Sequence, residues 1–260
     1  MSRPASRLNQ LPAQLREALL ERRLLKVIAG LTNFEAASVE RIARAADRGG
    51  ADLIDIACDP GLVQLAAGVS GLPICVSAVD PELFPAAVAA GATLVEIGNY
   101  DAFYPLGRVF DAEEVLAMTH RTRQLLPELV LSVTVPHGLP LDQQEQLAVE
   151  LVTAGADLIQ TEGGTSAKPC SAGSLGLIEK AAPTLAAAHS ISRALTAAGL
   201  ETPVLCASGL SAVTVPLAIA AGAAGVGVGS AVNRLNDELA MVAVVRGLRE
   251  ALGGGVRAAV

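Results

Sequence analysis

The sequence predicts an α/β fold, a single (β/α)8 TIM barrel with a short extra helix at its N-terminus. The first observation is composition: of 260 residues, 52% are hydrophobic and only 2% aromatic, so small aliphatic residues must fill the core. Such residues suit helices packed closely on a buried parallel sheet, whose strands are near-continuous apolar runs. The second observation is a sequence motif that recurs along the chain. The third is the number of strands that can be identified from this motif.

Four stretches share one pattern, in which a helix end is followed by Gly and a short apolar strand. They are RGGADLIDIA, ending at Ala57, AAGATLVEIG, ending at Gly98, TAGADLIQTE, ending at Glu162, and AAGAAGVGVG, ending at Gly229. Gly is favoured just after a helix because the residue there often adopts a positive φ. Each stretch therefore marks the point where a helix gives way to a strand.

Strands of a second type lie between these four. GLPICVSA is entered through Pro73, LLPELVLSVTV through Pro127 and LETPVLCAS through Pro203, while LLKVIAG opens the series at Leu24 without a proline. Proline ends a helix and costs no ladder donor at the start of a strand. The two types alternate, separated by amphipathic segments such as NFEAASVERIARAADRGG, and give eight right-handed βα units. A doubly wound open sheet is the alternative, but it usually has fewer strands.

We expect residues 1–23 to hold a capping helix over roughly 12–23, residues 24–252 to form the barrel, and residues 253–260 to be a flexible Gly-rich tail. Residues 202–233 carry no charged side chain and are long enough to cross a membrane. Proline and glycine interrupt this stretch, so we expect strand, helix and strand instead, and no membrane partner.

The net charge and the cysteines indicate which partners and which cellular compartment to expect. A net charge of −7 argues against nucleic acid, which requires clustered Lys and Arg. The four cysteines have neither metal-ligand spacing nor a secreted disulfide pattern, and the N-terminus lacks the apolar core of a signal peptide. A cytoplasmic protein with reduced thiols is the expectation.

Polar side chains inside the apolar strands are the first candidates for chemistry, because active sites of such barrels lie at the carboxyl ends of the strands. Lys26, Asp55, Glu96 and Gln160 should point into the barrel, since side chains alternate across a strand. Burying an unpaired charge is costly, so Lys26 should pair with Asp55 or Glu96. The set is either a structural ion-pair network or an acid/base or Schiff-base lysine tuned by carboxylates.

Glu162 and His137 follow the sixth and fifth strands. Glu162 could act as a general base or grip a ligand hydroxyl, and His137 could transfer protons or serve only as a hydrogen-bonding group. No pair of histidines has ligand spacing, so no metal site is expected. His120 and His189 fall in helical segments, and we interpret Cys58 and Cys206 as packing residues.

Glycine-rich turns follow the last two strands, where barrels of this type hold phosphate. Ser208 and Gly209 follow the seventh strand, and Gly229 and Ser230 follow the eighth. Their backbone N–H groups, with a helix dipole beside them, could bind an anion. Gly163 and Gly164 are further candidates, at the start of a long polar loop over residues 163–174 that we interpret as a lid or binding loop carrying Lys168. Gly225 and Gly227 lie inside the last strand and serve close packing.

Three functions fit these residues. The leading hypothesis is an enzyme acting on a small phosphorylated metabolite, with isomerase, epimerase or lyase chemistry through proton transfer or an imine on Lys26. The second is an oxidoreductase with FMN as cofactor, its phosphate in the same pocket. The third is a barrel that binds a metabolite or assembles with partners without turnover, in which an Ala-rich helix over residues 183–198 could form a homo-oligomer face.

Five motifs carry a resemblance to a known family. VEIGNYDAFY, LSVTVPH, LIQTEGG, EKAAPTLAAAHSIS and ASGLSAVTVPLAIAAGAAGVGVGSAVN resemble the uncharacterised hypothetical chloroplast reading frame twenty-three family of cyanobacteria and algal plastids, over about residues 24–234. The resemblance implies an aldolase-type barrel and a photosynthetic host, and it supplies no reaction. The ends of the last two strands are similar, more distantly, to those of thiazole synthase, sugar-phosphate epimerases and flavin-dependent oxidoreductases.

Overall fold

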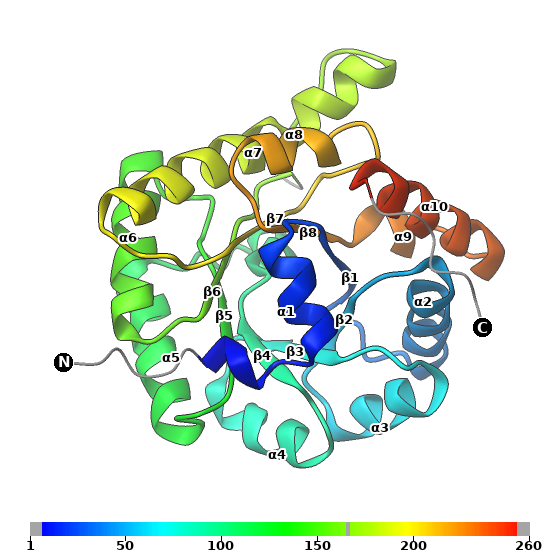
Figure 1. The fold of residues 1–260 in the computed structure, drawn as a ribbon, viewed down its shortest axis with the longest axis horizontal. Coiled ribbons are helices and arrows are strands. Elements are labelled where there is room, and N and C mark those ends of the chain that lie inside the picture. The colour runs from blue at the N-terminus through cyan, green and yellow to red at the C-terminus, as the bar shows by residue number, and fades with distance from the viewer. Residues whose placement is uncertain (1–6, 165–166, 254–260) are drawn as a thin grey trace.

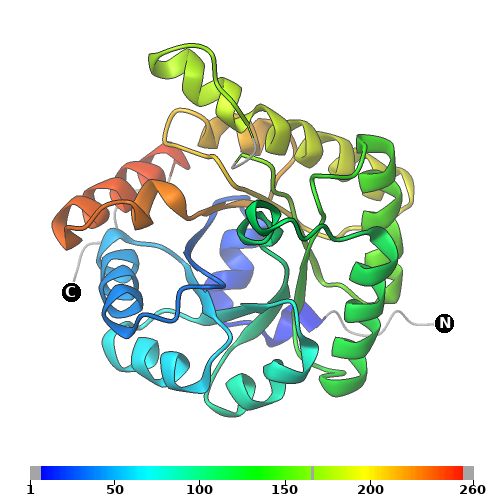
Figure 2. The same ribbon diagram turned by 180° about the vertical axis from the view of Figure 1, so that it is seen from behind.

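The computed structural model describes residues 7–164 and 167–253 and shows a closed barrel of eight parallel strands, in sequence order around the ring (Figures 1 and 2). The strands are β1 Leu24–Gly30, β2 Leu53–Ala57, β3 Ile74–Ala78, β4 Leu94–Ile97, β5 Leu131–Thr134, β6 Leu158–Gln160, β7 Val204–Ala207 and β8 Gly225–Val228. The barrel closes through the pairing of β8 with β1. The predicted fold is confirmed, and the open sheet is excluded.

Helices surround the barrel. They are α1 Ala13–Leu20, α2 Ala36–Gly49, α3 Pro60–Val69, α4 Phe84–Ala89, α5 Ala112–Leu125, α6 Leu141–Ala154, α7 Gly173–Ala197, α8 Val215–Ala220, α9 Ser230–Asn233 and α10 Glu238–Ala251. Short 3₁₀ turns occur at η1 Arg7–Gln10, η2 Pro81–Leu83, η3 Tyr100–Ala102 and η4 Tyr104–Leu106. Two helices follow the last strand, because the chain turns between α9 and α10. None of the described helices is both long and apolar enough to cross a membrane.

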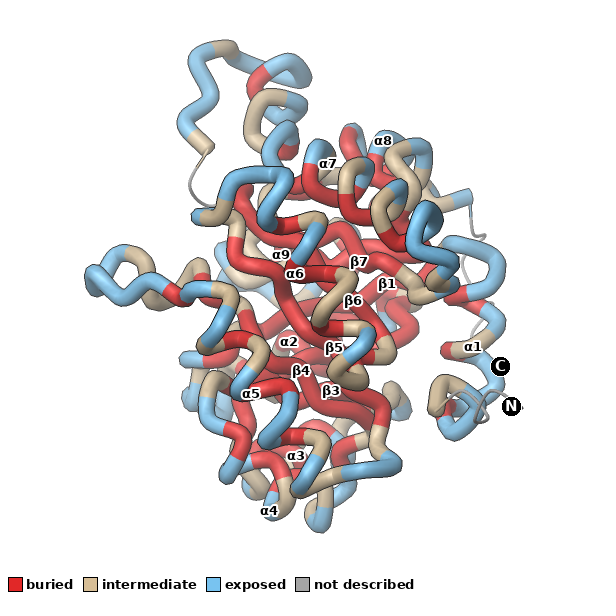
Figure 3. The backbone as a smooth tube through the Cα atoms, turned by 90° about the vertical axis from the view of Figure 1, so that its left-hand side faces the viewer, coloured by how far each residue is buried: buried red, intermediate tan, exposed pale blue. Residues whose placement is uncertain are grey.

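The predicted N-terminal helix closes one end of the barrel. Helix α1 lies across the centre of the ring in Figure 1, at the amino ends of the strands. Leu15 and Leu19 pack there against Leu24 of β1 and Leu94 of β4, in a cluster separate from the main core. The main core lies between the strands and the outer helices, and Figure 3 shows the buried strands at the centre of the molecule.

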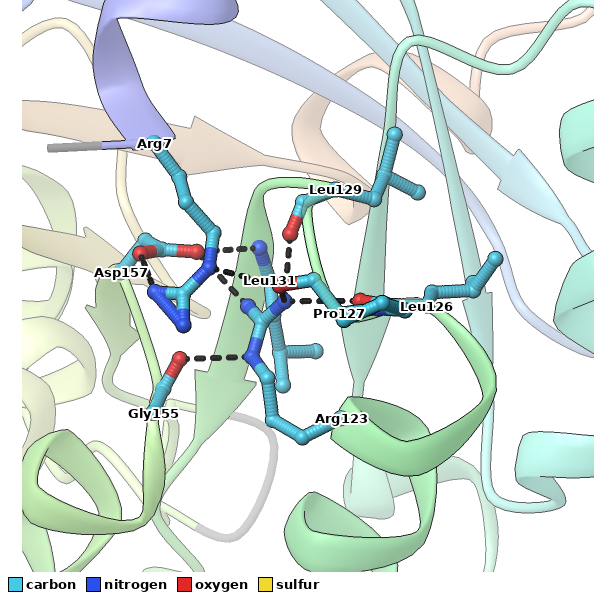
Figure 4. A network of polar contacts seen from close by, with 8 residues as sticks. All are labelled: Arg7, Arg123, Leu126, Pro127, Leu129, Leu131, Gly155 and Asp157. Atoms are coloured by element: carbon cyan, nitrogen blue, oxygen red, sulfur yellow. Dashed lines mark hydrogen bonds and ion pairs between the residues drawn. The ribbon is translucent and has the colours of Figure 1, made fainter. Parts of the chain in front are cut away.

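The recurring Gly-Ala motif also makes hydrogen bonds between strands at the amino end of the barrel. Just before β2 and just before β6, the aspartate of GADL accepts a hydrogen bond from a backbone N–H of the preceding strand, Asp52 from Leu25 and Asp157 from Leu131. An arginine from an outer helix completes each unit: Arg249 donates to Asp52 and Arg123 to Asp157. Figure 4 shows the second unit.

Arg123 makes further hydrogen bonds in this second unit. Its guanidinium also donates to the carbonyl oxygens of Gly155 at 2.8 Å and Leu129 at 2.6 Å. Arg7 adds an ion pair to Asp157 at 3.0 Å (Figure 4). Before β4 a Thr takes the place of the aspartate, and Thr93 accepts from the N–H of Ile74. In three of its four copies the repeat seen in the sequence therefore forms a clamp that joins neighbouring strands at their amino ends, whereas the fourth copy has Ala224 at this position.

The opposite end of the barrel carries the longer loops. In Figure 2, seen from behind, the loop between β4 and α5 lies over the centre of the ring. The beginning of α7 projects away from the barrel in Figures 1 and 2, so the described part of the loop before it does not cover the centre. The segment predicted to act as a lid includes residues 165–166, which lie outside the described residues. Among the residues that the structure describes, the loop after β4 lies over the barrel end (Figure 2).

Candidate functional site

The polar residues that the sequence placed inside the strands meet in one cluster, here called the inner cluster: Lys26, Asp55, Glu96 and Gln160. Lys26 Nζ lies 2.6 Å from Glu96 Oε2 and 3.0 Å from Asp55 Oδ2. Gln160 Nε2 donates to Glu96 Oε1 at 2.6 Å. All four side chains are almost fully buried. The predicted pairing of Lys26 thus occurs with both carboxylates.

Hydroxyl groups on β3 and β5 donate hydrogen bonds to these carboxylates. Ser77 Oγ donates to Asp55 at 2.5 Å and Ser132 Oγ to Glu96 at 2.8 Å. The register explains the second contact, because Ser132 on β5 is the partner of Glu96 on β4. On β2 the register partner of Ser77 is Ala57, two residues after Asp55. Strands β1 to β6 each contribute at least one polar side chain, with Thr134 a second one from β5, so that the buried charges have polar or ionic partners as burial requires.

Charge pairing controls protonation in the inner cluster. Burial opposes the charged form of Lys26, but Asp55 and Glu96 outweigh it and raise the Lys26 pKa well above its usual range. Burial raises the pKa of Asp55 to about 6, against the lowering effect of Lys26. Imine formation needs a neutral amine, so this geometry favours the alternative in which Lys26 is a buried ion-pair cation.

A second group, here called the outer cluster, consists of Asp101, His137 and Glu162. His137 Nδ1 lies 3.1 Å from Glu162 Oε1 and 3.7 Å from Asp101 Oδ1. Tyr104 donates its hydroxyl to Glu162 Oε1 at 2.5 Å, and its ring packs edge-on against His137. Glu162 is 2% exposed, although it stands at the end of its strand.

Two groups of the outer cluster, Glu162 and His137, have raised pKa values. Burial raises the pKa of Glu162, and the charge of Asp101 adds to this, whereas hydrogen bonds from His137 and Tyr104 oppose it. Burial alone would lower the pKa of His137, but the hydrogen bond and charge of Glu162 reverse the direction and raise it. Perturbed groups that converge at a strand end are typical of functional sites.

The predicted phosphate residues line one cavity of about 170 Å³ at the carboxyl ends of β1, β7 and β8. Ser208, Gly209, Gly229 and Ser230 all contribute to its wall. Ser208 and Gly209 both have a φ of +74°, which turns the chain sharply after β7. Helix α9 has only four residues, so the predicted dipole adds little.

Gly163 and Gly164 lie at the start of the loop after β6, where the sequence placed them. Neither lines the cavity. A Cβ on Gly164 would stand 2.4 Å from the Gly209 Cα, so this glycine lets the loops after β6 and β7 touch. In β8, a Cβ on Gly225 would stand 2.7 Å from the Leu24 Cβ, which agrees with a packing role for that glycine.

Two residues that the sequence did not single out connect the clusters to the cavity. Asn99 lines the cavity and donates to Glu96 of the inner cluster at 3.3 Å. Asp101 lines it too, and accepts a hydrogen bond from Ser208 at 2.7 Å. Both lie in the loop directly after β4. Their place at a strand end was the available signal, but a loop rich in polar residues does not reveal which side chains turn inward.

The other candidates take structural positions. Cys58 and Cys206 are buried, and burial raises the pKa of their thiols to about 12 and about 11. A neutral buried thiol is inert as a nucleophile, which agrees with packing. His120 and His189 lie in α5 and α7, as expected.

The fold is shared with several phosphate-ester enzymes of known structure. The chain superimposes on 3-hexulose-6-phosphate synthase with a TM-score of 0.59 at 19% identity, covering 88% of this chain and 99% of the other. For thiamine phosphate pyrophosphorylase from Pyrococcus furiosus the TM-score is 0.54 at 18% identity, with coverages of 90% and 98%. At such identities the likeness establishes the barrel alone.

Sequence relatives establish the family. Uncharacterized protein ycf23 of Cyanophora paradoxa is 44% identical over 225 residues, covering 86% of this chain and 90% of the relative. Its namesake in Cyanidium caldarium is 34% identical over 236 residues, covering 91% and 93%. The family model described as protein of unknown function (DUF561) matches residues 11–256. The resemblance found in the sequence is confirmed, and the chain belongs to this family.

Proposed function

We propose that the protein is an enzyme that acts on a small phosphorylated metabolite by proton transfer, with chemistry of the isomerase, epimerase or lyase type. The observation that carries the proposal is the common cavity: the four predicted phosphate residues line it, and Asn99 and Asp101 connect it to two clusters of buried titratable groups. The names of the structural neighbours refer to phosphate esters, which supports the same class of ligand.

A second cavity suggests the shape of the substrate. A largely apolar cavity of about 220 Å³ shares Leu31 and Thr32 with the first and is lined further by Phe34, Leu83 and Phe103. The substrate would place its phosphate against the turns after β7 and β8 and its carbon skeleton toward these side chains.

Proton transfer is favoured over an imine as the chemical step. Lys26 is held as a cation by Asp55 and Glu96, whereas the carboxylates of both clusters can accept and return a proton. Incubation with small phosphorylated aldehydes and ketones in D₂O should lead to deuterium uptake at the carbon next to the carbonyl. Glu162→Gln and Glu96→Gln, both close in shape to the original, should show which cluster supplies the base.

The phosphate position is tested by adding charge to it. Ser230→Asp should weaken binding of inorganic phosphate by more than tenfold, since a like charge about 4 Å away costs about 4 kcal/mol at an effective dielectric of 20. Ser174→Asp, on an exposed residue at the start of α7, is the matched control and should bind phosphate as the parent does. Calorimetry that finds equal phosphate affinity for both variants would refute this position.

A further inference from the structure

The phosphate cavity has an unexpected charge. Asp101 is the only ionisable group among the described residues that line it, and no Lys or Arg is among them. A carboxylate beside a phosphate dianion is repulsive at short range. The proposed ligand therefore calls for a positive charge near Asp101.

The outer cluster is built to hold such a charge. Asp101, His137 and Glu162 offer ligand atoms that all lie within 4.8 Å of one another. They come from the loop after β4 and from the ends of β5 and β6, which explains why their spacing in the sequence gave no hint of a ligand set. One imidazole and two carboxylates form a donor set that suits first-row divalent cations.

Two oxygen atoms of this cluster lack partners. Glu162 Oε2 and Asp101 Oδ1 are buried, and neither has a hydrogen-bond partner among the described residues. Only 2% of Glu162 is exposed, so an ionised oxygen without a partner is costly there. Hydrogen bonds from Tyr104 and His137 reach only its other oxygen, Oε1. A cation between the three side chains would satisfy both atoms.

The inner cluster, in contrast to the outer cluster, already contains a cation. Asp55, Cys75 and Glu96 also bring ligand atoms within 4.8 Å of one another. Lys26, however, already supplies a cation at 2.6 and 3.0 Å from the two carboxylates. A metal ion would have to displace this buried ammonium group, so the inner cluster is not a metal site.

We infer that Asp101, His137 and Glu162 bind one divalent transition-metal cation, of the class of Zn²⁺ or Mn²⁺, at the edge of the phosphate cavity. Three protein ligands leave a position open for the substrate, as in catalytic sites. Tyr104 and Ser208 are positioning residues, because each donates a hydrogen bond to one of the ligating carboxylates. Cation binding itself does not depend on the reaction; contact between the ion and the substrate rests on the proposed function.

Calorimetry on the full chain, freed of metal with a chelator, tests this site with Zn²⁺ and Mn²⁺ in turn. The expected result is one ion per chain. His137→Gln and Glu162→Gln should weaken binding by more than the roughly 10–100-fold typical of an outer partner, and Tyr104→Phe by an amount within that range. His120→Gln and Glu113→Gln, on exposed residues of α5, are the matched controls and should bind as the parent does.

The outcomes separate this inference from the proposed function. Absence of binding by the parent, or equal affinity in the parent, His137→Gln and Glu162→Gln, would overturn the metal site. Phosphate binding that persists in such a protein would leave the proposed function in place. Ser230→Asp gives the reverse case, since it should lose phosphate and keep the ion. Circular dichroism of each variant confirms folding, and Tyr104→Phe retains the ligands if the other variants do not fold.

Discussion

At the scale of single residues, Lys26 is a charged side chain in an almost fully buried position. It is 1% exposed and lies between two buried carboxylates. If Lys26 served catalysis alone, Lys26→Met would abolish turnover without unfolding the protein, but its contacts indicate a structural role as well. Lys26 neutralises charge that the barrel interior cannot otherwise accommodate.

Lys26→Met should therefore lower the free energy of unfolding by about 3–5 kcal/mol, because it leaves Asp55 and Glu96 buried without their cation. Urea denaturation measures the loss. The triple variant with Asp55→Asn and Glu96→Gln is the matched control and should recover much of the stability. A single variant as stable as the parent would show that Lys26 is not the structural cation.

Asp55 should give the folded protein a distinct pH dependence. Its pKa rises on folding from an ordinary 3.8 to about 6, so the folded state binds more protons than the unfolded state between these values. Stability contributed by this group is therefore present at low pH and falls as pH rises through this window. Asp55→Asn should remove that slope, and chemical denaturation from pH 4 to 7 compares the two proteins. Parallel curves would contradict the assignment.

At the scale of elements, the amino ends of the strands are joined by the aspartate–arginine clamps. Arg123 on α5 binds Asp157 and four main-chain carbonyl groups around β5 and β6 (Figure 4). Both side chains of the pair are close to fully buried, with exposures of 11% and 7%. One arginine thus ties an outer helix to the entrance of two strands.

Arg123→Ala should cost about 1–3 kcal/mol, because the carbonyl groups around it lose their donor and Asp157 keeps only Arg7 and one backbone N–H. Arg121→Ala on the same helix removes an exposed pair with Glu82 and should change stability little. The difference between the two unfolding midpoints in urea is the measurement. Comparable losses in both would mean that the clamp is no stronger than a surface ion pair.

At the scale of the whole molecule, the two ends of the barrel differ. Helix α1 and its leucines close the amino end, whereas the cavities and the outer cluster occupy the other. Stability at one end can then change without altering ligand binding at the other.

Leu15→Ala should lower stability by about 2–5 kcal/mol, since Leu15 is 1% exposed in the cluster beneath α1. Phosphate binding, measured by calorimetry at a temperature where the variant is folded, should be unchanged. Leu20→Ala, at a position 84% exposed, is the control and should be within about 0.5 kcal/mol of the parent. A loss of phosphate affinity in Leu15→Ala would show that the two ends are coupled.

Much of this architecture follows from local patterns. The Gly-Ala and Pro-led strands predicted the order, number and type of all eight strands, because the residues that end a helix and begin a strand act over short distances. The same patterns placed Lys26, Asp55, Glu96 and Gln160 on inward faces, since a strand alternates its side chains and a charge inside an apolar run is stable only where partners surround it.

Local sequence was sufficient to predict the barrel, its capping helix, the inner cluster and the four glycine and serine positions that line the cavity at the ends of β7 and β8. Three features emerged only once the whole chain was folded: both carboxylates hold Lys26, Gly163 and Gly164 stand outside the cavity, and Asn99 and Asp101 connect it to the clusters. The difference lies in distance along the chain. Local rules decide where a strand ends, but contacts between different loops depend on how the closed barrel brings those ends together.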